Sequence, residues 1–311
     1  MKRILFFATA AIVALASCAK TEVVYKDAPR EIAFKQIAGP MTKAESLTGD
    51  MGVFAWTVTS PAEYFGNTQF TETGDIWKAN PSKFYPIQGE LDFAYYSPYA
   101  LGWTFNGSTT LTSPALSDIK DTDVLYGKTI ATSPKTDAAL NVVLAHALAK
   151  VTVNVTTDEA SKGYITITEV TLSDTHLGGT LTVTYDAKAA SNAVWAADAA
   201  SSLTWTHDVL LNSIDNVPYG HNYIIADYGS GTTYEQGTLA VSYSMDIDGA
   251  GAGTEMYTGT ATFNLSGSPK AYWNMGNNYI YNIKATLTEI TFDADVEEFV
   301  DTPAAGTPVE L

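Results

Sequence analysis

The chain has 311 residues, a formal net charge of −17 and a sequence pI near 4.4. It holds only 17 lysines and arginines, and none lies between Lys188 and Lys270. This composition excludes a basic surface for nucleic acid or anionic lipid headgroups. The length allows one large domain or two ordinary domains with substantial cores, and the acidity is typical of a surface that keeps an exported protein soluble.

The first residues have the layout of a secretory signal. Lys2 and Arg3 precede an uncharged apolar run at 4–16, which is too short to span a bilayer comfortably. The run closes on Leu-Ala-Ser-Cys, the pattern of a bacterial lipobox, and Cys18 is the only cysteine of the chain. We expect residues 1–17 to be removed and Cys18 to carry the lipid, and the alternative is an ordinary signal with a chance cysteine. Ala19, in place of aspartate, favours the outer membrane.

Short runs with a period of two dominate the rest of the chain. In the run at 150–157, Val151 and Val153 point to one side and Thr152 and Asn154 to the other, as in a half-buried antiparallel strand. Similar runs lie at 31–38, 164–173, 179–187, 238–247 and 279–292. The runs are rich in β-branched residues, which favour strands, and Gly, Pro, Asn and Asp between the runs favour turns. The sequence therefore predicts an all-β fold of antiparallel β-sandwiches.

The pattern divides the chain into five parts. Residues 18–30 form a lipidated tether after the signal, and residues 31–158 form an N-terminal β-sandwich whose last strand is the run at 150–157. A polar hinge leads to a C-terminal β-sandwich at 159–300. The last residues, 301–311, contain two prolines and form a tail.

No constellation indicates catalysis, a metal or a cofactor. The four histidines lie far apart in the sequence, without metal-ligand spacing, and His146 sits between apolar residues like a hydrogen-bonded core histidine. We therefore predict no enzyme and no cofactor, although an unrecognised pair of carboxylates in a secreted hydrolase stays an alternative.

An aromatic segment spans 84–105. Its tyrosines and tryptophan, with a tryptophan just upstream, can stack on sugar rings or alternate into the core, and the core interpretation is favoured. The candidate glycan-binding residues are Trp77, Tyr96, Tyr99 and Trp103.

Several motifs in order resemble the Bacteroidales fimbrillin family, the subunits and relatives of type V pili. They follow the lipobox at Cys18 and cover nearly the whole chain. They are "EIAF" at 31–34, "TKAE" at 42–45, "MGVFAW" at 51–56, "LDFAYYSP" at 91–98, "DTDVLYG" at 121–127, "HALAKVTVNV" at 146–155, "YWNMGNNYIYNI" at 272–283 and "ITFDADVEEF" at 290–299.

The resemblance implies two transthyretin-like antiparallel β-sandwich domains in tandem and export as a lipoprotein. In such pilins a trypsin-like protease cuts after a basic residue behind the first strand, and a strand from a neighbouring subunit fills the groove that opens. Here the displaced strand would carry Ile32 and Phe34. The candidate donor residues are Phe292, Val296 and Phe299, although the first half of this stretch equally fits the last strand of the chain's own second domain.

One position departs from the family pattern. Lys43 stands where the family usually has arginine, so an arginine-specific protease would not cut there. Cleavage at Arg30, the other candidate, would free the lipid and leave the first strand in place. The chain would then stay anchored, be processed at lysine, or act as a tip or accessory subunit.

The resemblance favours a structural or adhesive pilus subunit on the outer cell surface. The expected partners are other pilin subunits or copies of the chain, the outer membrane through the lipid, and ligands on host or bacterial surfaces. The alternative is a permanently anchored lipoprotein that binds glycans through the aromatic segment.

Overall fold

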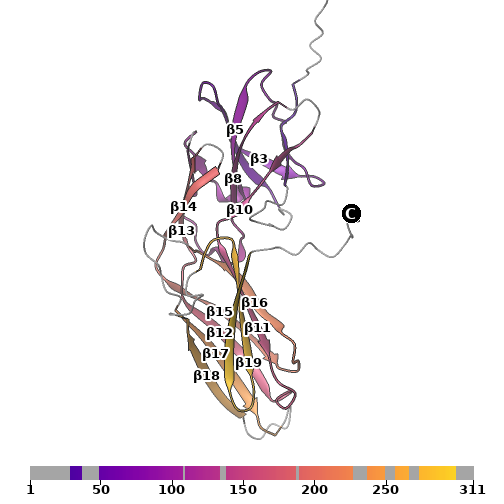
Figure 1. Cartoon of the computed structure of the whole chain (residues 1–311), viewed down its shortest axis with the longest axis vertical. Coiled ribbons are helices and arrows are strands. Elements are labelled where there is room, and N and C mark those ends of the chain that lie inside the picture. The colour runs from indigo at the N-terminus through magenta and orange to yellow at the C-terminus, as the bar shows by residue number, and fades with distance from the viewer. Residues whose placement is uncertain are drawn as a thin grey trace, which may run out of the picture.

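A computed structural model describes residues 29–36, 49–107, 109–133, 138–186, 189–226, 237–248, 256–265 and 273–298. These residues form strands and two short 3-10 helices, η1 (Tyr99–Leu101) and η2 (Ile119–Asp121). The prediction of an all-β fold is confirmed. Figure 1 shows an elongated molecule, with the strands of the N-terminal half at one end of its long axis and a sandwich of later strands at the other.

The first half of the chain builds one eight-stranded sheet in the order β10-β8-β5-β2-β3-β4-β1-β9. Its strands are β1 (Ala33–Gln36), β2 (Met51–Thr57), β3 (Glu63–Glu72), β4 (Trp77–Ala79), β5 (Glu90–Ser97), β8 (Leu125–Thr132), β9 (Leu140–Val142) and β10 (Ala145–His146). Phe34 on β1 lies 5.3 Å, between ring centroids, from Phe93 on β5, four strands away in the sheet order. The sheet must therefore curl around its own core, which also contains Ile32, Phe70 and Leu91.

A second, four-stranded sheet covers the other face of β2, β5 and β8. It has the order β14-β13-β7-β6. Its strands are β6 (Thr104–Phe105), β7 (Thr110–Thr112), β13 (Gly179–Asp186) and β14 (Ala189–Ala197). Val183 on β13 pairs with Leu111 on β7, and Trp195 on β14 donates a hydrogen bond from Nε1 to the carbonyl of Ala147, 2.8 Å away. The hairpin of β13 and β14 therefore completes the N-terminal half from residues that follow the predicted boundary at 158/159.

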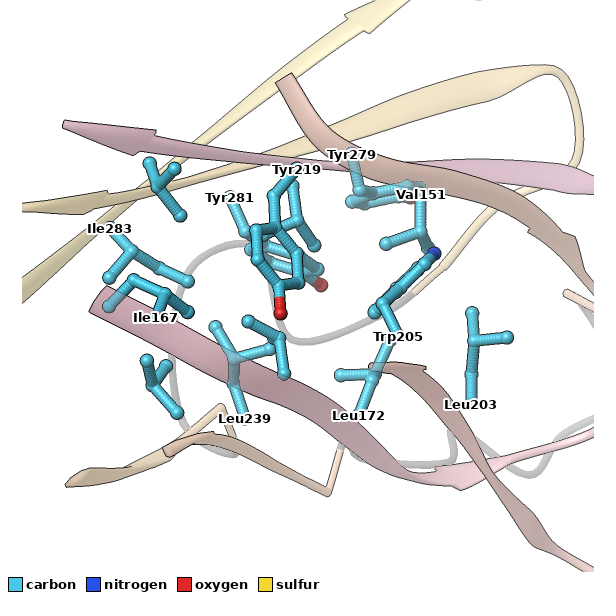
Figure 2. Close-up of a cluster of buried hydrophobic side chains, with 14 of the residues drawn as sticks. Val151, Ile167, Leu172, Leu203, Trp205, Tyr219, Leu239, Tyr279, Tyr281 and Ile283 are labelled. Carbon is cyan, nitrogen blue, oxygen red and sulfur yellow. The ribbon is translucent and has the colours of Figure 1, made fainter. Parts of the chain in front are cut away.

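Two four-stranded sheets form the C-terminal sandwich, with the orders β16-β11-β19-β20 and β15-β12-β17-β18. Their strands are β11 (Ala149–Thr156), β12 (Ile165–Thr175), β15 (Ser201–Leu210), β16 (Val217–Ile224), β17 (Thr238–Asp246), β18 (Met256–Asn264), β19 (Asn277–Ala285) and β20 (Ile290–Glu298). Figure 2 shows Val151, Ile167, Leu239, Ile283 and Trp205 in one buried cluster between the sheets.

Two pairings differ from the expected antiparallel sandwiches. β1 runs parallel to β9, and β11 runs parallel to β19. β11, which we expected as the last strand of the first sandwich, lies inside the second sandwich between β16 and β19. In the sequence, 120 residues separate β11 from β19, and a parallel pair requires a long crossover instead of a tight turn. The alternation in the sequence does not encode these distant partners.

Candidate functional site

The first strand, β1, is short but deeply buried. It pairs antiparallel with β4 and parallel with β9. Ile32, just before it, and Phe34 are completely buried. The Phe34 ring meets the rings of Phe70 and Phe93 edge-on, with centroids 5.1 and 5.3 Å away. Such aromatic pairs add about 0.5–1.5 kcal/mol each beyond the burial of area, so the inward Phe34 ring helps to hold β1 in the sheet.

The approach to β1 is fixed by backbone and surface contacts. The N–H of Ile32 donates to the carbonyl of Lys83 over 2.7 Å, and the N–H of Tyr85 donates to the carbonyl of Arg30 over 2.8 Å. The Glu31 carboxylate accepts hydrogen bonds from Lys78 at 2.5 Å and from Ser82, which lower the pKa of Glu31. The pair with Lys78 is partly exposed, and such surface pairs contribute little to stability.

The candidate processing sites lie on either side of β1. Arg30 is half-buried and precedes the first bridge, between Glu31 and Phe84. Cleavage after Arg30 would leave Ile32 and Phe34 in the fold, whereas cleavage behind β1 would separate both from it. Lys43 and Cys18 lie outside the described residues.

The candidate donor stretch forms β20 of this chain. β20 is an edge strand that pairs with β19 along its whole length. The Phe292 ring stacks on Phe263 of the facing sheet, with centroids 5.3 Å apart, whereas Val296 is exposed. The other edge of β20 has no neighbouring strand among the described residues, and Phe299 lies beyond them.

The aromatic segment lies mostly in the core. Trp77, Tyr96 and Trp103 are buried, and Tyr99 is half-buried. The rings of Tyr96 and Trp103 stack on each other at 5.2 Å, so they present no flat face to a sugar. Burial raises the pKa of Tyr96. The alternation of Phe93 and Tyr95 with Ala94 and Tyr96 distributes these side chains between the two cores of the N-terminal half.

The described residues contain no group of three or more His, Cys, Asp or Glu side chains placed to hold a metal. His146 is buried, and its Nδ1 lies 2.9 Å from the carboxylate of Asp123. In the same part of the chain, no helix is long and apolar enough to cross a membrane.

Sequence reasoning missed two features. One is the buried ion pair between Asp92 and Lys128, although a carboxylate between Leu91 and Phe93 was the available signal. The other is an apolar groove around Ile87 near the start of β1. No sequence pattern reveals this groove, because its lining comes together only when the segment after β4 meets the N-terminal segment.

A family model described as fimbrillin-like matches residues 42–298. The chain belongs to the fimbrillin-like family. The motif resemblance is thereby confirmed, and it places this fimbrillin-like protein among non-enzymatic structural proteins of fimbriae, which are cell-surface appendages. No curated protein matches the chain.

Solved structures support the fold of the fimbrillin-like chain. A proposed cell adhesion protein from Bacteroides uniformis superposes with a TM-score of 0.55 at 16% identity, covering 86% of this chain and 98% of that one. A fimbrial protein from Bacteroides vulgatus also gives 0.55 at 16% identity, covering 87% and 99%. A proposed cell adhesion protein from Bacteroides ovatus gives 0.50 at 15%, covering 88% and 99%. At these identities the likeness establishes the fold alone.

Proposed function

We propose that this fimbrillin-like chain is a structural or adhesive pilus subunit that is exported as an outer-membrane lipoprotein anchored at Cys18. Removal of β1 by a protease then lets a strand of another subunit replace it. Family membership supports the general role, and the lipobox supports the anchor.

The observation that carries the strand-exchange step is the construction of β1. The four residues of β1 are inserted between β4 and β9, and Phe34 on the strand and Ile32 just before it are fully buried. Burying two such side chains stabilises by about 3–6 kcal/mol as an upper estimate. Loss of β1 would leave apolar slots and two strand edges with unpaired N–H and C=O groups. Such an edge is a template for strand addition.

The donor is proposed to come from the end of another subunit. In this chain, β20 alternates apolar and acidic residues, and Phe292, Val296 and Phe299 are the candidate anchors. Because Phe292 is engaged with Phe263 in the chain's own sandwich, the exposed Val296 is better placed than Phe292 to reach a neighbour. Other pilin subunits or further copies of this chain are the proposed partners.

Protease treatment of the full chain tests the proposal. Cleavage after Lys43 should release β1 and give oligomers that survive mild denaturant, whereas cleavage after Arg30 should leave monomers that keep β1. Size analysis with N-terminal sequencing of each product measures this. Lys43→Ala is the matched control, because it keeps every other lysine and should not oligomerise. A Lys43-cut product that stays monomeric with candidate partner subunits present would contradict strand exchange and leave an anchored accessory role.

A further inference from the structure

An apolar groove of about 490 Å³ lies where the described chain begins. Ile87 is 73% exposed there, and Tyr64 and Phe84 are 40% and 45% exposed. The Tyr64 hydroxyl donates to the carbonyl of Phe84 over 2.8 Å, which joins the two sides of the groove. Its lining residues are Pro29, Tyr64, Phe84, Tyr85, Pro86 and Ile87. Exposed apolar side chains gathered in one groove are typical of a surface that another segment covers.

The register beside the groove leads the N-terminal segment into it. Glu31 lies opposite Phe84 between two hydrogen-bonded positions, Ile32 with Lys83 and Arg30 with Tyr85. Continued in the same register, Pro29 falls opposite Pro86, and residue 28 falls opposite residue 87. Hydrogen-bonded and non-hydrogen-bonded pairs alternate in an antiparallel ladder. The two prolines therefore form a non-hydrogen-bonded pair, which suits them because proline has no N–H to donate. The next hydrogen-bonded pair would join residue 28 to Ile87.

The segment that precedes Pro29 has apolar side chains that could fill the groove. Residues 21–28 read Thr-Glu-Val-Val-Tyr-Lys-Asp-Ala, and the apolar triplet at 23–25 is the first after the lipobox. An extended chain advances about 3.3 Å per residue. Tyr25 is four residues before Pro29 and therefore lies at most roughly 13 Å from it along the chain, so the triplet is close enough to the groove to reach it.

We infer that residues 23–28 of this chain lie across the groove and cover Tyr64, Phe84 and Ile87. The backbone pairing ends near residues 28 and 87, because the strand that follows, β5, is already paired with β2 and β8. The inference deepens the proposed function, because the same segment links Cys18 to β1. Docking shields the bonds after Lys26 and Arg30 from a trypsin-like protease. It thereby directs cleavage to the stretch behind β1, where a cut can free the strand.

The test is the rate at which a lysine-specific protease cuts the full chain, purified in detergent, after Lys26. Ile87→Asp places a charge in the groove and should speed this cleavage about tenfold, because cleavage follows the population of the undocked segment. The rate after Lys43 in the same molecules should stay unchanged, which separates undocking from general unfolding. Ile247→Asp is the matched control, since Ile247 is also exposed but lies at the β17–β18 connection.

A synthetic peptide of residues 19–32 sets the rate for an undocked segment. A full chain cut after Lys26 as fast as this peptide, and insensitive to Ile87→Asp, would overturn the inference. A concentration-dependent dimer that Ile87→Asp abolishes, with no change at Lys26, would also overturn it and assign the groove to a second copy. Oligomer formation by the Lys43-cut product is measured separately, so either proposal can fail without the other.

Discussion

Asp92 and Lys128 form an ion pair on the face of the curled sheet that the β13–β14 hairpin covers. Lys128 Nζ lies 2.8 Å from Asp92 Oδ2, and the two side chains are 13% and 3% exposed for Asp92 and Lys128. Lys128 Nζ also lies 5.6 Å from the centroid of the Tyr185 ring. Burial raises the pKa of Asp92, and the hydrogen bond from Lys128 opposes this rise. The ion pair therefore contributes little net free energy to folding, but removal of either charge would leave the other buried without compensation.

We expect Lys128→Met to destabilise the protein by about 3–5 kcal/mol at pH 7, because it leaves a buried carboxylate without its cation. Folding then favours protonated Asp92, so the folded state binds more protons than the unfolded chain and the loss shrinks as the pH falls toward 4. Denaturant unfolding at both pH values measures this.

The double variant Asp92→Leu/Lys128→Met should recover most of the stability, and Lys284→Met, at an exposed lysine, should change little. A Lys128→Met loss that is equal at both pH values would contradict the account.

We expect the Cys18 thiol to be the point at which the lipid is attached covalently. Cys18→Ala should abolish incorporation of a tagged fatty acid and membrane retention of the precursor, because the thiol is the attachment point and each buried methylene contributes about 0.8 kcal/mol to anchoring. Metabolic labelling of cells that express each form measures this. Equal labelling of the wild type and the variant would exclude the lipobox interpretation.

Among the structural elements, the β13–β14 hairpin connects the two halves of the chain. Val183 is fully buried against the N-terminal half, whereas its neighbour Thr184 is exposed. Val183→Asp buries an unpaired charge, which costs several kcal/mol unless the hairpin detaches. We expect faster amide hydrogen exchange in β5 and β8 of this variant, although both strands lie at least 50 residues earlier in the chain. Thr184→Asp should exchange like the wild type. Unchanged protection of β5 and β8 in Val183→Asp would show that the hairpin does not support the N-terminal half.

The positions of several strands could be predicted from the sequence, but the strands with which they pair could not. The alternation at 150–157 and 164–173 predicted β11 and β12 within two residues, and Val151, Val153 and Val155 all face the core as expected. The single run at 279–292 is two strands, β19 and β20, because a turn at residues 286–289 interrupts it. A period of two specifies which face is buried and carries no information about the neighbouring strand. The pairs β7–β13 and β11–β19 therefore required the structure.

The same limit applies to the candidate site. Ile32 and Phe34 could be predicted as inward residues of a first strand, because they alternate with Glu31 and Ala33. The sequence could not show that β4 and β9 enclose them, nor that Trp77, Tyr96 and Trp103 are buried. An aromatic side chain suits a core and a sugar platform equally well in a sequence.

For the whole molecule, a fragment that ends at residue 158 tests how the halves depend on each other. It lacks β13 and β14, and it contains β11 without β16 and β19. We expect this fragment to expose the face that carries Tyr96 and Tyr126, to bind the dye ANS and to aggregate, because an uncovered apolar face promotes association. A folded, monomeric fragment with native-like tryptophan fluorescence would contradict the interdependence.

In the export that we propose, the hairpin also constrains how the chain folds. A polypeptide that crosses a membrane from its N-terminus presents β7 long before β13, and their paired residues Leu111 and Val183 are 72 positions apart. Closing such a distant contact is slow relative to local strand pairing. The N-terminal half must therefore wait, with one face of its sheet uncovered, until residue 197 has emerged. This interval is when a periplasmic chaperone would have most to bind.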